Sequence, residues 1–597
     1  MAELTDRKKA EEIEKYLKVL QQIRLPWEDT VDDLLRFVNH SRRLIADNWS
    51  NMPNQYYTKG RKTGTEVFSD AAILARNILV DGMAGSYCPR NTPWYKYALP
   101  GRLNFPRVSV MRQWTGKRMD EYPAVKKWLQ DASEATLAAY NFSNFYDVIT
   151  EFVSDAAVPG TANIFAEEEI GKGRIVFTVP HFRECYIAEN QYGRVDTIYR
   201  LYNLTLRQLA DKFGMDIMNA ADKGFKKAYE ENFHFERQII HAVFPRSDYD
   251  GSRIDAKGKP IASLWVYRSG GQGVASSLLD ESGYDWLPFS TWRWRKNSDE
   301  WYGRSPAWDA WTSIARSNQE AKSNMMAAQK MVEPPLVIPA DLRGAVQTGP
   351  NGKTYIDNYG GDIRRRAPMP LNQNIQLPFS VDAENKTRQI IDEHFHTPFF
   401  QMLLQMTMNK VTASPTQVIE MMGEQAAVLG TRMGNFEGEG LNPIHDRVFE
   451  IEARAGRMPP PPQILLDSGG RKIPQIMYQN ALSQAQVRLS KVRTIQSGVQ
   501  MAGQIAQIVG PVAIDKIDVD EVMDEIFDAA GFPESCIRDE KQVQQIREIR
   551  NKKQEQMEKL EAMKVVPKAA AAMSKTAQEG SPMKALMGDQ EGEAANG

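Results

Sequence analysis

Two short segments gather side chains that could do chemistry. Residues 349–354 read Gly-Pro-Asn-Gly-Lys-Thr and approach a phosphate-binding loop, while residues 392–396 read Asp-Glu-His-Phe-His and hold potential metal ligands. A phosphate-binding loop needs Gly-x4-Gly-Lys-Ser/Thr followed by a helix. Here Gln347 stands where the first glycine is required, and residues 354–356 read as a strand. The pattern therefore favours a turn between two strands over a nucleotide site around Lys353.

The two histidines of the second segment are wrongly spaced for a metal site. On a helix, residues i and i+2 point about 200° apart, whereas histidine ligands on one helical face are spaced i, i+4. We expect a helix with polar, half-buried histidines at 394 and 396. The chain also lacks a nucleophile elbow, a dinucleotide fingerprint and an isolated carboxylate pair. We therefore expect no catalytic residue, no metal and no cofactor.

The densest basic run is Arg364, Arg365 and Arg366. A solvated turn is the default interpretation of such a run. An anchor for an acidic partner or for phosphates is the functional alternative, and the residues themselves leave both open.

Length and composition bound the class of protein. A chain of 597 residues is too long for one core and suggests three or four domain-sized pieces. Net charge is −2, so the chain has no global basic footprint for nucleic acid. Three distant cysteines exclude a disulfide framework and a zinc ribbon. The N-terminus does not resemble a signal peptide and residues 498–514 are interrupted by glutamines and Gly-Pro, so we expect a soluble cytoplasmic product.

The elements that position these segments are of mixed type in the first half of the chain. Apolar spacing predicts helices over 6–24, ending before Pro26, over 30–48, and from Ala71 to a stop at Gly85 and then Pro89. Strands are predicted at 174–179, 194–201, 261–268 and 288–295, with a short helix at 205–213. The fold class expected is therefore α+β.

The second half shows a more specific order. Ser305 can cap, and Pro306 can open, a helix that runs to Val332 and is about 42 Å long. A compact β segment rich in Gly and Pro follows, then a helix over 380–404, a polar loop, and a capping box at Ser414. The remaining predictions are a helix weakened by glycines, a restart at 442–456, a proline spacer at 459–462, helices over 480–563 and a disordered end after residue 567.

This order resembles the portal proteins of tailed bacteriophages, and in particular the head-to-tail connector family of short-tailed phages. The matching segments are 27–37, Phe-Ser-Asp-Ala-Ala at 68–72, Trp94-Tyr95, Pro-Gly-Thr-Ala-Asn at 159–163, Gly-Arg-Ser-Pro at 303–306, 441–459 and 515–538. The resemblance covers residues 5–555 and implies a ring-forming portal fold of wing, stem, clip and crown.

The resemblance also assigns segments. The wing is 1–304, the first stem helix 305–332, the clip 333–379, the second stem helix 380–404, the tunnel loop 405–414, a long kinked wing helix 415–456, a linker 457–474, a helical crown 475–563 and a disordered tail 564–597. It implies that the tunnel loop faces DNA through Met406, Met408, Asn409, Lys410 and Thr412. It implies that the clip docks partners through Lys353, Arg364, Arg365 and Arg366.

The implied function is a dodecameric ring at one capsid vertex, through which the genome is packaged and ejected. The implied partners are other copies of the chain, the terminase motor, a tail adaptor, major capsid and scaffolding proteins, internal core or ejection proteins, and double-stranded DNA bound without sequence specificity; no membrane is implied. The implied location is the virion, with assembly in the bacterial cytoplasm. Two alternatives remain at this point: another virion structural or injection protein, and a phosphate or nucleotide hydrolase built around Lys353.

Overall fold

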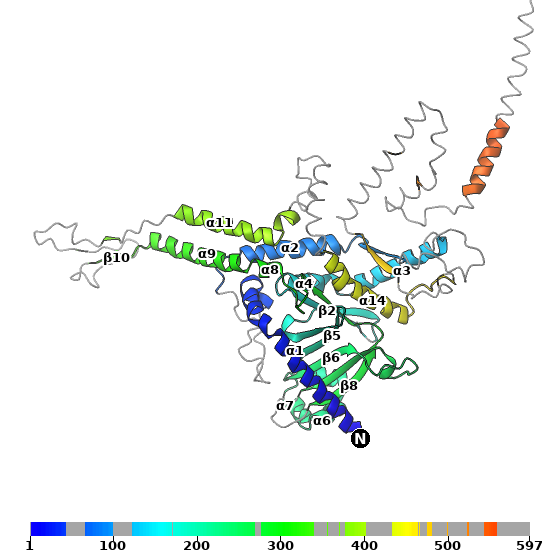
Figure 1. Ribbon diagram of the computed structural model, residues 1–597, viewed down its shortest axis with the longest axis horizontal. Helices are drawn as coiled ribbons and strands as arrows, with labels where there is room; N and C mark the ends of the chain where they lie inside the picture. Colours follow the sequence, from blue (N-terminus) through cyan, green and yellow to red (C-terminus); the bar gives the residue numbers. More distant parts are fainter. Residues whose placement is uncertain are drawn as a thin grey trace, which may run out of the picture. The chain divides into compact units, whose positions relative to one another are not determined.

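The computed structural model shows a mixed protein of helices and antiparallel sheets, in agreement with the α+β expectation (Figure 1). It describes residues 2–42, 66–99, 122–169, 171–268, 276–338, 355, 369–370, 377–401, 433–463, 465, 474–479, 498, 522–523 and 543–557. The chain divides into two units, Met1–Asp120 with Trp128–Arg493, and Glu121–Lys127 with Thr494–Gly597. In the second unit residues 543–557 are helical, as predicted. The elements below belong to the first unit, except that α3 (Pro123–Phe142) begins in the second.

The larger sheet is an antiparallel meander of five strands in the order β4-β5-β6-β7-β8. Its strands are β4 (Cys185–Glu189), β5 (Val195–Thr205), β6 (Glu236–Pro245), β7 (Ile261–Tyr267) and β8 (Ser277–Tyr284). Between β5 and β6 lie three short helices, α5 (Leu206–Phe213), α6 (Met215–Ala221) and α7 (Phe225–Glu231). The predicted strands at 194–201 and 261–268 and the predicted helix at 205–213 are thus confirmed.

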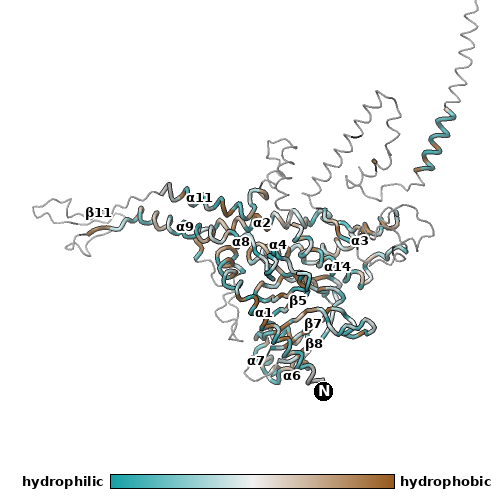
Figure 2. Tube along the Cα trace, viewed as in Figure 1, coloured by the Kyte–Doolittle hydropathy of each residue, from teal (hydrophilic) through white to brown (hydrophobic). Residues whose placement is uncertain are grey.

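Side chains of this sheet alternate between two apolar layers, because successive residues of a strand point to opposite faces. Ile240 and Ala242 of β6 pack with α1 (Ala2–Val38), which contributes Leu17 and Leu20 among others. Ile239 faces the opposite side and packs with α5, α6 and α7. Figure 2 shows the resulting hydrophobic colouring along β5 and β7. The sheet is therefore covered on both faces.

Helix α1 is continuous through Pro26, so the prediction of two helices separated by this proline is wrong. A proline inside a helix removes one hydrogen bond and costs about 3 kcal/mol. Long-range contacts outweigh that cost. Arg24 is buried, and its Nη1 donates to the carbonyl oxygens of Phe182, Arg183 and Cys185 at 3.0, 3.0 and 2.9 Å. The helix also buries apolar side chains on both sides of the proline: Ala10, Ile13, Leu17, Leu20, Val31, Leu34, Leu35 and Val38.

The smaller sheet has three strands in the order β3-β2-β9, all antiparallel. They are β2 (Thr161–Glu169), β3 (Arg174–Thr178) and β9 (Phe289–Arg293), and the last two confirm predicted strands. Helices α4 (Phe145–Ala157) and α14 (Asn442–Arg454) contact this sheet. Helix α2 (Ala71–Tyr87) contacts α4 and ends between Gly85 and Pro89, the two residues predicted to stop it. Single helical turns lie at His40–Arg42, Phe182–Glu184 and Ala256–Gly258.

A two-stranded ribbon joins distant parts of the first unit. Strand β1 (Tyr95–Ala98) pairs with β12 (Gln475–Tyr478), so the first residues of the segment that the resemblance assigns to a helical crown form a strand. A cluster of aromatic rings surrounds His445 of α14 beside this ribbon, with centroids 4.3 to 5.9 Å away: Trp94, Tyr95, Tyr140 and Tyr478. The Tyr140 hydroxyl lies 3.0 Å from His445 Nδ1. Burial lowers the pKa of His445 to about 3, so the ring is neutral at ordinary pH.

Among the described residues, none of the helices has the length and apolar content needed to span a membrane. No group of three or more His, Cys, Asp or Glu side chains in the same part of the chain is arranged to hold a metal ion.

Candidate functional site: a helical hairpin on a buried polar junction

The first long helix of the second half begins where the sequence predicts, but it is broken near its start. Ser305 Oγ accepts a hydrogen bond from the Trp308 N–H at 3.0 Å and caps α8 (Pro306–Asp309). Helix α9 (Trp311–Val332) then starts anew after Ala310, so the prediction of one unbroken helix is wrong. Contacts to neighbouring segments explain the break: the Ser305 hydroxyl also donates to the carbonyl of Val158, at the end of α4, at 2.6 Å, and Arg295, just after β9, binds Asp309 at 2.8 Å.

The second long helix also departs from its predicted extent. Helix α11 (Leu377–His394) ends ten residues before the predicted end at 404, and residues 397–401 start a new helical turn. His396 lies between them with φ of 52°, in the left-handed region that a non-glycine residue seldom adopts. The surrounding packing holds this conformation, since Phe395, Phe399 and Phe400 are all buried. A helix with half-buried histidines is therefore confirmed only up to His394.

Helices α9 and α11 form an antiparallel hairpin (Figure 1). Polar side chains fix their register: Asn324 Nδ2 donates to Glu384 at 2.7 Å, and the Thr387 hydroxyl lies 2.9 Å from Glu320. Near the base of the hairpin, Ile314 and Ser317 are buried with Thr387 and Ile391. Between the far ends, β10 (Leu336–Val337) pairs with β11 (Met369–Pro370), and both strands lie in the stretch where a compact β segment was predicted.

Two sequence motifs meet at the base of α8. Residues 159–163 and 303–306 carry part of the family resemblance, and the Gly303 N–H donates to Thr161 Oγ1 at 2.8 Å. The two backbones touch here: a Cβ on Gly303 would lie 2.4 Å from the Gly160 carbonyl oxygen. Gly160 itself has φ of +92°, which favours glycine. Both glycines are therefore required by this junction between the small sheet and the hairpin.

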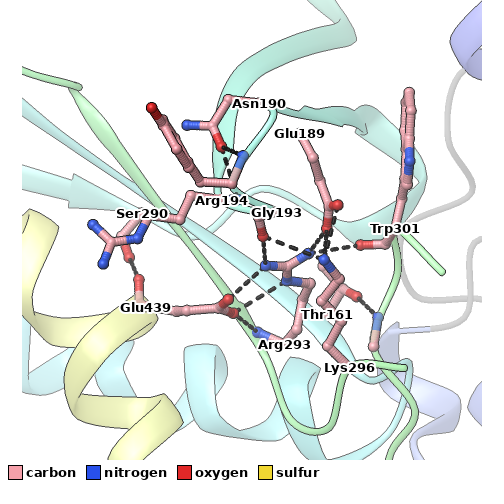
Figure 3. A network of polar contacts seen from close by, with 12 residues as sticks. Thr161, Glu189, Asn190, Gly193, Arg194, Ser290, Arg293, Lys296, Trp301 and Glu439 are labelled. Carbon is pink, nitrogen blue, oxygen red and sulfur yellow. Dashed lines mark hydrogen bonds and ion pairs between the residues drawn. The ribbon is translucent and has the colours of Figure 1, made fainter. Parts of the chain in front are cut away.

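Arg293, the last residue of β9, is the centre of a polar network beside this junction (Figure 3). Its side chain is 0% exposed and lies between Glu189 and Glu439. Lys296 also binds Glu189, at 2.7 Å. Glu439 belongs to a different part of the chain, the π-helical turn Phe436–Leu441 that leads directly into α14. The network therefore joins the large sheet, the small sheet and the helix of residues 433–454.

All five N–H groups of the Arg293 guanidinium have an acceptor. Nε and Nη2 donate to the two Glu439 oxygens at 3.1 and 2.5 Å. The remaining donors reach Glu189 and two backbone carbonyls, those of Gly193 at 3.0 Å and Trp301 at 3.3 Å. Burial alone lowers the pKa of Arg293, but the carboxylates of Glu439 and Glu189 outweigh it and raise its pKa above the usual value. Two acids and two bases thus form a compensated buried cluster.

Every residue proposed from the sequence as a site falls outside the described residues. These are the tunnel-loop residues Met406, Met408, Asn409, Lys410 and Thr412, and the clip residues Lys353, Arg364, Arg365 and Arg366. The structure instead identifies Arg293, Glu189, Lys296 and Glu439, which the sequence reasoning missed. One signal was available: Arg293 lies between Trp292 and Trp294 in a strand pattern, and a charge at such a place is either exposed or paired when buried.

Comparison with known proteins decides the family. The family model described as "Bacteriophage head to tail connecting protein" matches residues 10–537. The chain belongs to this family. It is 29% identical over 543 residues to the "Portal protein" of Salmonella phage epsilon15, covering 89% of this chain and 90% of the relative. It is 26% identical over 493 residues to the "Probable portal protein" of Bordetella phage BPP-1, covering 81% and 82%.

The function of this connector is accordingly that of a bacteriophage portal, and portal proteins are structural components of the virion at the capsid vertex. Membership implies assembly with capsid and tail components. A solved chain titled "Virion of native gene transfer agent (GTA) particle" covers 71% of the connector and 95% of its own length, at 12% identity and a TM-score of 0.25. That score is too low to support an argument about the fold.

Proposed function

We propose that twelve copies of the connector form a closed ring at one capsid vertex, through which double-stranded DNA enters during packaging and leaves during ejection. Family membership supports the position in the virion. Head-to-tail contacts between identical subunits give a ring when their rotation closes.

The observation that carries the ring is the exposed apolar surface of the α9–α11 hairpin. Beyond the buried seam at its base, α9 exposes Met325, Met326, Met331 and Val332, and α11 exposes Val381 and Ile390. In Figure 2 hydrophobic and hydrophilic colours alternate along these helices. These side chains lie on more than one side of α9, and helices in proteins gain most of their stability from packing apolar side chains against a partner. Hairpins of neighbouring copies packed side by side would cover this surface.

The proposed channel also suits the charge of the chain. Duplex DNA carries one negative charge per about 1.7 Å, so a strongly basic wall would bind it tightly. A conduit must let DNA slide, and a net charge of −2 is compatible with weak contact. We assign this contact to the tunnel loop 405–414, where Lys410 is the single charged residue, flanked by Met406, Met408, Asn409 and Thr412.

The hairpin leads into residues 339–376, which fall within the proposed clip 333–379. We assign docking of the terminase motor and the tail adaptor to Lys353 and to Arg364, Arg365 and Arg366, because a basic run can bind acidic partners. Contacts with major capsid, scaffolding and internal core or ejection proteins, and assembly in the bacterial cytoplasm, belong to the same proposal and rest on the family.

Negative-stain electron microscopy of the purified chain tests the ring. We expect closed rings with a central channel, and views along the symmetry axis give the number of subunits. Native mass spectrometry of the same sample measures that number independently. A strictly monomeric protein at high concentration, without rings, would contradict the proposal.

A further inference from the structure

The helix of residues 433–454 contains an unusual turn. Residues 433–435 are helical, Phe436–Leu441 form a π turn, and α14 follows without interruption. At the end of the π turn the Asn442 N–H donates to the Glu437 carbonyl, five residues back and not four. Such turns are rare insertions of one extra residue into an α-helix and are frequent at functional sites.

Two contacts from β9 hold this turn. The Ser290 hydroxyl lies 2.5 Å from the Glu439 carbonyl oxygen and 2.6 Å from that of Gly440, so it satisfies backbone acceptors in the altered turn. The Glu439 carboxylate is fixed by Arg293, as described above. One side-chain hydroxyl and one ion pair therefore bind two consecutive residues of the π turn to the same strand.

Close packing on the inner side of the turn reinforces these contacts. Gly440 is buried against Trp292, and a Cβ at this position would lie 3.4 Å from Trp292 Cβ and 3.2 Å from the Phe436 ring. The Phe436 and Trp292 ring centroids are 4.5 Å apart. At Gly438, in contrast, a Cβ would meet no atom of the described residues within 4 Å, so the outer side of the turn has room for a side chain.

Successive residues of an α-helix are rotated by about 100° about the helix axis. One extra residue in the π turn therefore rotates the helical residues before it by about this angle. With the π turn in place, Met433 is 5% exposed and lies on the buried side, as do Phe436, Leu441 and Ile444. Gly434 is exposed. With one residue fewer, Met433 would take the exposed position that Gly434 has now.

We propose that the π turn sets the rotation with which the chain before residue 433 joins the small sheet and α14, and that Ser290 and Glu439 are the positioning residues that hold it. The ion pair with Arg293 fixes the position of Glu439. The extra residue of the π turn allows Met433 to remain buried while this ion pair is kept. The inference does not depend on ring formation.

Thiol labelling of the full-length protein tests whether the π turn sets the rotation of residues 433 and 434 about the helix axis. Met433→Cys and Gly434→Cys are made separately in a Cys536→Ser background, in which Cys88 and Cys185 are buried. We expect the thiol at 433 to react about ten-fold more slowly than the thiol at 434. Deletion of Gly438 should raise the reaction rate of the thiol at 433 about ten-fold. Glu439 stays bound to Arg293 and Ser290, whereas the helical residues before the deletion rotate about the helix axis. Gly438→Ala keeps the chain length and should leave both rates unchanged.

A second variant covers the case in which the deletion fails to fold. Ser290→Ala combined with Glu439→Gln keeps the chain length, removes the hydroxyl contact and reduces the contact with Arg293 to one uncharged acceptor, so the thiol at 433 should again react faster. An unchanged slow rate at 433 in a folded deletion variant, or in this double variant, overturns the inference. Negative staining of the parent protein follows the ring separately, so a parent protein without rings but with the expected labelling rates in all variants counts against the ring proposal alone.

Discussion

Arg293 and Glu439 are 146 residues apart in sequence, yet the carboxylate accepts two hydrogen bonds from the guanidinium, at 3.1 and 2.5 Å. Glu439 is only 30% exposed and Arg293 is fully buried. Breaking a buried pair by removing one partner leaves a charge without compensation, which costs about 3 to 5 kcal/mol. The pair is therefore a condition for the fold around the hairpin base.

We expect Arg293→Met to lower the apparent melting temperature strongly, corresponding to about 3 kcal/mol or more. Arg293→Lys should recover little of the loss, because a lysine cannot supply five donors in a planar arrangement. Arg295→Met is the matched control: its ion pair with Asp309 is partly exposed and should contribute no more than about 1 kcal/mol. Equal effects of the Arg293 and Arg295 changes would contradict the assignment.

Acid should destabilise the connector through His445. Its pKa is about 3 in the folded protein and near 6.5 when unfolded, so the unfolded state binds the proton first. Stability is therefore lost as pH falls from about 6.5 towards 3, by roughly 1.4 kcal/mol per pH unit. His445→Phe should lose stability at pH 7 but show a smaller further loss between pH 7 and pH 5. Melting temperatures across this range measure it, with exposed His234→Gln as the control; parallel pH curves for His445→Phe and the parent protein would rule the effect out.

A charge placed on the exposed apolar surface of the hairpin should prevent ring assembly. Met326 is 49% exposed, so Met326→Lys should leave the melting temperature of the single chain within a degree or two. In a neighbour contact the same lysine would be buried without a partner, at a cost of several kcal/mol. Ile254→Lys, at a fully exposed apolar residue outside the hairpin, controls for the added charge. Size-exclusion chromatography and negative staining measure assembly, and rings of Met326→Lys at parental yield would exclude this surface from the contact.

Deletion of residues 406–413 should leave ring assembly intact while reducing DNA packaging or retention. The reason is that the proposed tunnel loop contacts DNA and not the neighbouring subunit. Phage particles complemented with the deletion variant are compared for the fraction of DNA-filled heads, and purified protein is examined for rings. Loss of rings would show that this segment has been assigned wrongly.

Local signals in the sequence predicted local structure well. The Ser305 cap with Pro306, the alternation of Trp292 and Trp294, and the helix predicted from Asn442 onward all depend on neighbouring residues. The order of these elements, with motifs such as Gly-Arg-Ser-Pro, was also enough to identify the family.

Long-range contacts explain where prediction failed. Helix α1 runs through Pro26 because Arg24 is held by a distant turn, and the helix predicted from Ser305 is broken at Ala310 because the start of α8 is bound to the end of α4. The same reason applies to the site: Glu439 stands in a Gly-Glu-Gly segment that reads as solvent-facing, and only the folded chain brings it to Arg293. Buried pairs between distant residues leave no spacing for a sequence pattern to detect.

The pairing of β1 with β12 has a consequence for synthesis of the chain. Tyr95 bonds with a strand that contains Tyr478, about 380 residues later. At roughly 5 to 20 residues per second a ribosome takes about 20 to 80 s to reach that strand. Throughout this interval the edge of β1 lacks its native partner strand, and exposed strand edges recruit other chains. Nascent connectors are thus vulnerable to aggregation late in translation, and a chaperone that covers residues 94–98 until release would raise the yield of folded subunits.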